Sequence, residues 1–180
     1  MPTAPPNAPR FPIPLRFSDI DSYGHVNNVT YLGYLETARV LLHLMRPELP
    51  AAAGGEPGAT LRELAGADNQ TLVGRQEIEY RVPLEFRTAP VHVVVWVTRI
   101  GNSSFDLGYA VVDEVDEVDE DQTGTVHALA ASTMVLAAAA TGRPVPLPDG
   151  YRAALQQWAG PPVPFRNSGQ AAGAGQEATQ

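Results

Sequence analysis

Residues 28–45 read NVTYLGYLETARVLLHLM, and this stretch decides what the rest of the chain must fold around. Its apolar side chains recur at helical spacing, so several faces of one helix are apolar at once. The most regular face carries Tyr31, Leu35, Ala38 and Leu42. A helix that is apolar around so much of its circumference is buried. We expect Asn27 or Asn28 to cap its first turn and Pro47 to stop it.

Outside this helix the apolar pattern is mainly that of β-strands. Alternating or continuous apolar runs predict strands at about 11–17, 70–82, 91–100, 104–112 and 125–136. Residues 91–100 are apolar on both faces, which is typical of a central strand. A short helix is expected at 60–64. The order of the main elements is therefore β-α-β-β-β-β, which predicts an α+β fold.

The two ends of the chain have compositions that do not favour packing. Residues 1–10 are rich in Pro, and residues 159–180 are rich in Gly, Ala, Gln and Pro. Such segments bury too little apolar surface to offset the entropy lost on ordering. A length of 180 residues suits one domain. We therefore predict a disordered leader at 1–10, one folded domain at 11–158 and a disordered tail at 159–180.

Composition excludes several classes of function. A net charge of -8 repels nucleic acid and anionic lipid, so neither nucleic acid nor a membrane is an expected partner. All twelve basic residues are Arg and Cys is absent, which excludes Schiff-base and thiolate catalysis. No His spacing suits a metal, so no metal site is expected. No stretch resembles a signal peptide or a membrane span, which predicts a cytoplasmic protein.

One segment is unusually acidic: residues 113–121 read DEVDEVDED. Its spacing does not match the calcium-binding loop of EF-hands. We interpret it as a solvated loop between the last two strands.

The densest group of polar residues lies between the first strand and the buried helix. The N–H groups of a first helical turn have no intrahelical partner and can stabilise a carbonyl oxygen that gains negative charge. Asp21 could supply a carboxylate beside them, and the backbone at Asn28 could supply the N–H. Each residue also has an ordinary interpretation, because Asp and Asn before a helix are commonly turn formers and caps. On the helix itself, Glu36 and Arg39 are predicted to form an ion pair.

The stretch RFSDIDSYGHVNNVTYLGYLETAR at 16–39 resembles the signature of the 4-hydroxybenzoyl-CoA thioesterase family of hotdog-fold proteins. The likeness includes Asp19 and Asp21, the run GHVNN at 24–28 and the closing ETAR at 36–39. The family's layout continues in YRVP at 80–83, RIGNS at 99–103 and TGRP at 141–144. The resemblance therefore spans about residues 11–158.

This resemblance implies a fold and a reaction. The fold is a long helix wrapped by an antiparallel sheet, in a homodimer or homotetramer that pairs sheet edges and places active sites at the interface. The reaction is hydrolysis of an acyl or aroyl thioester to free acid and CoA, without a cofactor, since CoA is part of the substrate. By position, Asp21 is the nucleophile or general base and the Asn28 N–H polarises the carbonyl. His25, Asn27 and Tyr31 are the expected substrate-binding residues, and Asp19 is a structural neighbour that fixes the turn.

Two alternatives stay open at this stage. A hotdog protein can bind acyl-CoA or an acyl carrier protein without turning it over, and hydratases or dehydratases share the fold. The partners of four arginines are also open, because each can meet the phosphates of CoA or form a cross-strand ion pair. These arginines are Arg75, Arg81, Arg87 and Arg99.

Overall fold

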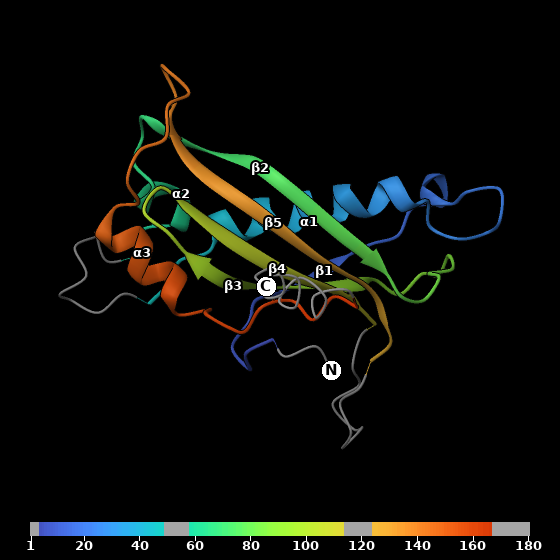
Figure 1. Cartoon of the computed structure of the whole chain (residues 1–180). Coiled ribbons are helices and arrows are strands. Elements are labelled where there is room, and N and C mark those ends of the chain that lie inside the picture. The colour runs from blue at the N-terminus through green and yellow to red at the C-terminus, as the bar shows by residue number, and fades with distance from the viewer. Residues whose placement is uncertain (1–3, 49–57, 114–123, 167–180) are drawn as a thin grey trace, which may run out of the picture.

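A computed structural model of the chain describes residues 4–48, 58–113 and 124–166 (Figure 1). The strands are β1 (Arg10–Ile13), β2 (Asn69–Tyr80), β3 (Val91–Ile100), β4 (Ser104–Val112) and β5 (Val126–Ala138). The helices are the 3-10 turn η1 (Phe17–Asp19), α1 (Asn28–Leu44), α2 (Leu61–Leu64) and α3 (Asp149–Gln156). The protein is α+β, as the sequence predicted.

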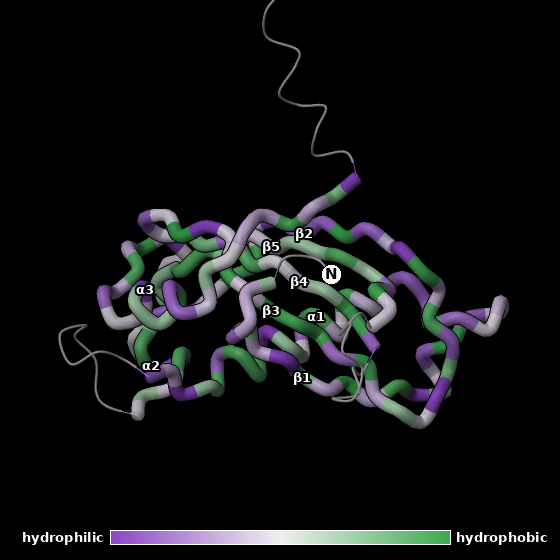
Figure 2. The backbone as a smooth tube through the Cα atoms, turned by 90° about the horizontal axis from the view of Figure 1, so that it is seen from below, coloured by the Kyte–Doolittle hydropathy of each residue, from purple (hydrophilic) through white to green (hydrophobic). Residues whose placement is uncertain are grey.

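The five strands form one antiparallel sheet in the order β1-β3-β4-β5-β2. The first two strands in the chain are therefore the two edges of the sheet. β3 lies inside the sheet and is buried on both faces, which confirms the expectation for residues 91–100. In Figure 2 the residues of the central strands are coloured mainly as hydrophobic, and many residues of the connecting segments are coloured as hydrophilic.

The main core lies between α1 and one face of the sheet, here called the inner face. Figure 1 shows α1 running behind the sheet. Its residues Leu35, Ala38 and Leu42 are fully or almost fully buried and share one cluster with Val93 and Leu107 of the sheet. Burial of apolar surface at this single interface fixes the helix on the sheet.

Both ends of α1 are set by local chemistry. The side chain of Asn27 accepts a hydrogen bond from the N–H of Val29 (3.0 Å), so Asn27 is the cap. At the other end Met45 is extended, and its N–H still bonds to the carbonyl of Leu42 (3.1 Å). The predicted helix at 28–45 is confirmed to within one residue.

The first strand is shorter than predicted. The sequence indicated 11–17, whereas β1 covers Arg10–Ile13 and η1 follows at Phe17–Asp19. Pro14 has no N–H to continue the ladder with β3. This early end leaves residues 14–27 free to turn back toward the start of α1.

The terminal segments differ from the predicted disordered leader and tail wherever the structure describes them. Ala8 and Val163 are buried in a second cluster on the outer face of the sheet, with Trp96 of β3. The N–H of Val95 bonds to the carbonyl of Pro9 (2.9 Å), and Trp96 Nε1 donates to the carbonyl of Pro161 (2.8 Å). Residues 4–10 and 159–166 therefore pack on the sheet. The rest of both segments lies outside the described residues.

Helix α3 was not predicted from the sequence. Tyr151, Ala154 and Leu155 are buried on one side of it, and Trp158 follows just beyond its end. This spacing is helical and was visible in the sequence. The edge-to-face contact between Tyr151 and Phe105 (centroids 5.8 Å apart) joins α3 to the main core.

Of the acidic segment at 113–121, only Asp113 lies within the described residues. No helix in the described part of the chain is long and apolar enough to cross a membrane.

Candidate active site

The loop before α1 is a tight hairpin between Ile20 and Val26, which form an isolated antiparallel bridge. Within it the N–H of Asp21 donates to the carbonyl of His25 (2.8 Å), and the N–H of Gly24 donates to the carbonyl of Asp21 (3.1 Å). Gly24 has a φ of 83°, a backbone conformation that residues with a Cβ rarely adopt. The hairpin thus fixes Asp21 at one side of a turn of only a few residues.

The carboxylate of Asp21 is held by the same hairpin. Its Oδ1 accepts hydrogen bonds from the backbone N–H of Tyr23 (2.8 Å) and of His25 (3.2 Å). Oδ2 has no hydrogen-bond partner among the described residues, and the side chain is half-buried. One oxygen therefore orients the group and the other is available to a ligand or to water.

A donor lies at the start of α1. The N–H of Asn28, the first residue of the helix, has no intrahelical acceptor and makes no other hydrogen bond among the described residues. The helix dipole adds partial positive charge at this point. Asn27, the neighbouring cap, is exposed and uses its side chain for the helix rather than for a ligand.

Asp19 joins the loop to the helix. Its Oδ2 accepts hydrogen bonds from the N–H of Arg16 (2.9 Å) and from the hydroxyl of Tyr34 on α1 (2.7 Å). Its carbonyl accepts from the N–H of Asn27 (2.8 Å). Burial, together with the hydrogen bond and negative charge of Asp19, raises the pKa of Tyr34 above its ordinary value. The structural role expected for Asp19 agrees with these contacts.

Tyr80, at the end of β2, holds the helix start from the other side. Its hydroxyl donates to the carbonyl of Asn28 (2.8 Å), and its ring meets Tyr31 edge to face with centroids 5.3 Å apart. Tyr31 itself is only 3% exposed, and burial, with Tyr80 beside it, raises its pKa to about 12. The structure thus places Tyr31 beneath the surface. Sequence reasoning missed Tyr80, although it opens the YRVP run at 80–83.

The residues that follow β2 pack against the hairpin and hydrogen-bond to it. The N–H of Val26 donates to the carbonyl of Leu84 (2.7 Å), and His25 forms an isolated bridge with Glu85. The imidazole of His25 is half-buried and makes no hydrogen bond among the described residues. Close by, the exposed rings of Phe17 and Phe86 meet edge to face, 5.9 Å apart.

The structure therefore places four of the five predicted site residues together in the hairpin and at the start of α1. These are Asp21, His25, Asn27 and Asn28. Tyr31 lies directly behind them in the core. Their roles in binding and catalysis stay predictions.

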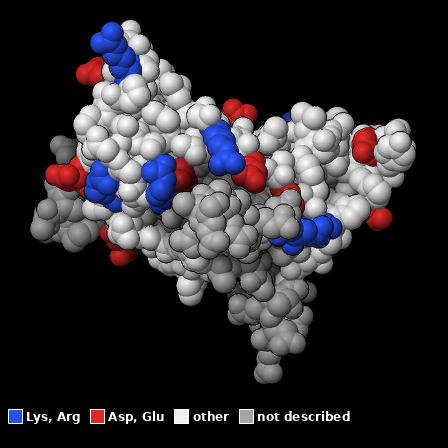
Figure 3. All heavy atoms as spheres, in the orientation of Figure 1, with Lys and Arg blue, Asp and Glu red and all other residues white. Residues whose placement is uncertain are grey.

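The four arginines left open by the sequence all have acidic partners. Arg75 pairs with Glu77 (2.7 Å), Arg81 with Glu79 (2.5 Å) and Arg99 with Asp106 (2.6 Å), and Arg87 pairs with Asp113. Figure 3 shows basic and acidic side chains next to one another over one face of the molecule. All four therefore form ion pairs in this structure, but only Arg99 with Asp106 pairs across neighbouring strands as predicted.

The predicted ion pair between Glu36 and Arg39 is wrong. Arg39 is 8% exposed and forms no ion pair within the described residues, whereas Glu36 is exposed. The two residues lie three positions apart, but Arg39 is on the side of α1 that is packed on the sheet, beside Ala38 and Leu42. Tertiary packing has overridden the local pairing.

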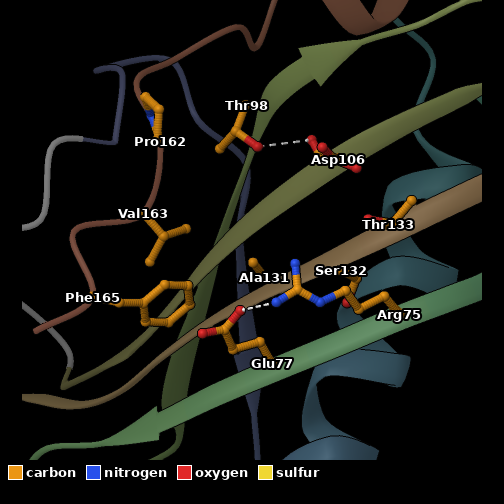
Figure 4. Close-up of a pocket in the computed structure, with 10 residues that line it drawn as sticks. All are labelled: Arg75, Glu77, Thr98, Asp106, Ala131, Ser132, Thr133, Pro162, Val163 and Phe165. Atoms are coloured by element: carbon orange, nitrogen blue, oxygen red, sulfur yellow. Dashed lines mark hydrogen bonds and ion pairs between the residues drawn. The ribbon is translucent and has the colours of Figure 1, made fainter. Parts of the chain in front are cut away.

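A separate cavity of about 240 Å³ lies on the outer face of the sheet (Figure 4). Arg75 and Glu77 of β2, joined to each other by their ion pair, line one side of it, and Val163 and Phe165 of the terminal segment line another. None of its lining residues belongs to the hairpin or to the start of α1. Among the residues the structure describes, no group of three or more His, Asp or Glu is placed to hold a metal ion.

A long helix on the inner face of a five-stranded antiparallel sheet, with a carboxylate just before the helix start, defines a hotdog-fold protein. A family model for the thioesterase-like superfamily matches residues 15–155. The chain belongs to this superfamily. No curated protein matches the chain significantly.

Solved structures agree with this assignment. The PA5185 protein of Pseudomonas aeruginosa PAO1 is 26% identical with a TM-score of 0.66, over 88% of this chain and 96% of that one. A thioesterase from Thermus thermophilus, crystallised with coenzyme A and Zn, is 26% identical with a TM-score of 0.59, over 83% and 99% of the two chains. A thioesterase-superfamily protein from Jannaschia sp. CCS1 shares the fold at 20% identity, with a TM-score of 0.66 over 88% and 98%. The family and these neighbours support a thioesterase-type function.

Proposed function

We propose that this protein is an acyl-CoA thioesterase that hydrolyses an acyl or aroyl thioester to the free acid and CoA. The narrower resemblance to the 4-hydroxybenzoyl-CoA thioesterases is part of the proposal. No further cofactor or metal is needed, because a thiolate is a good leaving group and CoA departs as a product.

The observation that carries the proposal is the arrangement of Asp21 and Asn28. The hairpin fixes the Asp21 carboxylate through Oδ1 and leaves Oδ2 without a partner among the described residues. The N–H of Asn28 is likewise unused, within the described part of the chain, at the positive end of α1. A fixed carboxylate and an unused N–H on adjoining segments are the two groups that acyl transfer requires.

In the proposed reaction the thioester carbonyl oxygen accepts a hydrogen bond from the Asn28 N–H. Asp21 either removes a proton from water as the water attacks the carbonyl carbon, or attacks that carbon itself. The carbon–sulfur bond then breaks, the electron pair leaves with sulfur, and the thiolate takes up a proton to give free CoA. In the second route, water hydrolyses the acyl–Asp21 anhydride and restores the carboxylate.

His25 and Asn27 are proposed to border the thioester, since both lie between Asp21 and Asn28. The half-buried imidazole of His25 has no hydrogen-bond partner among the described residues and is adjacent to the hairpin. Tyr31 is proposed to support the site from below through its contact with Tyr80.

Assembly into a homodimer or homotetramer is proposed as well. β2 is an edge strand that exposes Leu72 and Val73, and the outer side of α1 exposes Val40 and Leu44. Pairing of two such edges would cover unpaired backbone groups and apolar surface together.

The test is thiol release from a panel of acyl-CoAs that runs from acetyl to palmitoyl and includes benzoyl and phenylacetyl. Because the chain has no Cys, a thiol reagent detects only released CoA. We expect turnover by the wild type, and a loss of about a hundredfold or more in kcat for Asp21→Asn. Asp68→Asn, an exposed carboxylate elsewhere, is the matched control and should keep full activity. Binding of acyl-CoA without release of thiol would instead identify a non-catalytic acyl-CoA-binding protein.

A further inference from the structure

A cavity of about 410 Å³ lies between α1 and the edge strand β2, distinct from the hairpin site. The C-terminal half of α1 forms one wall with Arg39, Val40 and His43, and the beginning of β2 forms the opposite wall with Thr71 and Val73. Val40 and Val73 also belong to the surface proposed above for assembly, so the cavity borders that surface. A volume of this size suits part of a small-molecule ligand.

The cavity contains a buried cation without a counter-ion among the described residues. Arg39 is more than nine-tenths buried, and its Nη1 has no hydrogen-bond partner in the described part of the chain. A buried charge is costly unless it is paired and hydrogen-bonded. The guanidinium of Arg39 therefore lacks a counter-ion among the described residues and favours an anionic partner.

Two further polar groups lie beneath Arg39 on the inner face of the sheet. The hydroxyls of Tyr109 and Ser132 are buried, and neither has a hydrogen bond of normal geometry among the described residues. Burial raises the pKa of Tyr109, while the nearby Arg39 and Ser132 act to lower it, so the three groups form one cluster. Of these three groups only Arg39 lines the cavity, so Arg39 is the group that a ligand there would contact.

The charges around the cavity are mainly positive or neutral. Burial and the positive charges of Arg62 and Arg39 lower the pKa of His43, although its bond to the carbonyl of Arg39 opposes this. Its Nδ1 lies 2.7 Å from that carbonyl and donates to it, while Nε2 lies 3.3 Å from the Tyr151 hydroxyl. The lowered pKa favours the neutral form of His43. Glu36 is the one acidic residue in the described lining, and it is exposed.

The cavity and the hairpin site lie along the same pair of elements. Tyr80 at the end of β2 contacts Asn28 at the start of α1, while the beginning of β2 faces the end of α1. Arg39 follows Asn28 by eleven residues, or ~16 Å along the helix axis at ~1.5 Å per residue. Long side chains on a helix lean toward its N-terminus, which shortens the distance from the guanidinium to the Asn28 N–H. An acyl chain that joins the two places must span this shortened separation.

We infer that Arg39, with Arg62 at the rim, forms a carboxylate-binding subsite, and that the acyl group of the preferred substrate carries a second carboxylate at its far end. This inference rests on the proposed thioesterase function and narrows its substrate class to thioesters of dicarboxylic acids. The thioester lies at Asp21 and Asn28, and the distal carboxylate accepts hydrogen bonds from Arg39 in the cavity. A plain hydrocarbon end would leave this buried guanidinium unpaired.

The test compares matched pairs of substrates on the full chain. Adipyl-, suberyl- and sebacyl-CoA are assayed against hexanoyl-, octanoyl- and decanoyl-CoA. Binding of the free diacids adipate and suberate is measured by calorimetry, with hexanoate and octanoate as controls. The variants are Arg39→Gln, which removes the charge but keeps hydrogen-bond donors, and Arg143→Gln, an exposed arginine outside the cavity.

We expect the wild type to prefer the carboxylated member of at least one pair and to bind the matching diacid more tightly than the monoacid. Arg39→Gln should lower both the preference and the diacid affinity by about ten- to hundredfold, the range for a hydrogen-bonded charge. Arg143→Gln should change neither. If Arg39→Gln does not fold, the exposed Arg62→Gln is used, and we expect a loss of about threefold or more.

The other outcomes separate the two proposals. Hydrolysis of plain acyl-CoAs with no preference and no diacid binding overturns the subsite and leaves the thioesterase function standing. Diacid binding that Arg39→Gln abolishes, without hydrolysis of any thioester, supports the subsite and overturns the thioesterase function. If Arg39→Gln dissociates an oligomer and the wild type binds no diacid, the counter-ion of Arg39 comes from a second copy of the chain, and the subsite is overturned.

Discussion

The Oδ1 atom of Asp21 accepts a hydrogen bond from the backbone N–H of His25 at 3.2 Å. In the same hairpin the backbone N–H of Asp21 donates to the carbonyl of His25 at 2.8 Å. One residue thus holds the turn with its backbone and with its side chain. Only one carboxylate oxygen is used for this purpose among the described residues. The structural role of Asp21 and the catalytic role proposed for it are therefore separable by substitution.

Replacing Asp21 by Asn or by Ala should separate these two roles. Asn keeps an Oδ1 acceptor for the N–H groups of Tyr23 and His25, so the free energy of unfolding of Asp21→Asn should lie within about 0.5 kcal/mol of the wild-type value. Asp21→Ala leaves both donors without that acceptor, and its free energy of unfolding should fall by about 1–2 kcal/mol. Chemical denaturation measures the difference, and thiol release should fall about a hundredfold or more in both. Equal stability of Asp21→Ala and wild type would show that the carboxylate does not hold the hairpin.

Removing the hydroxyl of Tyr80 should loosen the start of α1. Tyr80→Phe keeps the ring contact with Tyr31 but loses the hydrogen bond to the carbonyl of Asn28. We expect a loss of about 0.5–1.5 kcal/mol in the free energy of unfolding. Because the Asn28 N–H would be less well positioned, kcat should fall several-fold while KM changes little. A change confined to KM would mean that Tyr80 contacts substrate rather than positioning the helix.

The outer face of the sheet leaves no space for a side chain at position 108. A Cβ on Gly108 would lie 2.6 Å from Trp96 Cε2 and 2.8 Å from Val163 Cγ2. Gly108→Ala should therefore cost about 1–3 kcal/mol, measured by denaturant unfolding. Gly33→Ala is the control, because nothing lies within 4 Å of its Cβ, and an Ala inside α1 should stabilise by about 0.5–1 kcal/mol. A neutral Gly108→Ala would mean that the terminal segment does not pack on Trp96 in solution.

Acid should weaken the ion pair at the end of β4. Asp113 Oδ1 lies 2.7 Å from His127 Nε2 and also pairs with Arg87. Burial acts to raise the pKa of Asp113, but the hydrogen bonds and charges of Arg87 and His127 outweigh it and lower the pKa below its ordinary value. The unfolded chain then takes up this proton at higher pH than the folded chain. The pair stabilises fully above about pH 4, and its contribution is lost as the pH falls through the folded pKa.

The measurement is thermal unfolding of the wild type and Asp113→Asn from about pH 3 to 7. The variant should melt lower at neutral pH, with a gap that narrows below about pH 4. A gap that stayed constant across the range would show that the charge of Asp113 is not what stabilises this end of the sheet.

The elements with local signals were predictable. The apolar spacing of 28–45 placed α1 to within one residue, a run apolar on both faces placed β3 at its observed ends, and alternation did the same for β4. Helix α3 was missed even though Tyr151, Ala154 and Leu155 have helical spacing. The low hydrophobicity of the terminal segments led to a prediction of disorder. Ala8 and Val163 are nevertheless buried, because both pack in the cluster that contains Trp96.

The candidate site was predictable to the extent that it is contiguous. The contacts that hold Asp21 come from residues two and four positions away, and the cap of α1 comes from the residue before it, so the sequence alone determined that a fixed carboxylate precedes a helix start. Tertiary structure alone decided that Tyr80, 52 residues away, supports Asn28. It likewise turned Arg39 away from Glu36 and into a cavity facing β2. Local hydrogen bonds depend on nearby residues, whereas burial depends on which distant surfaces the sheet brings together.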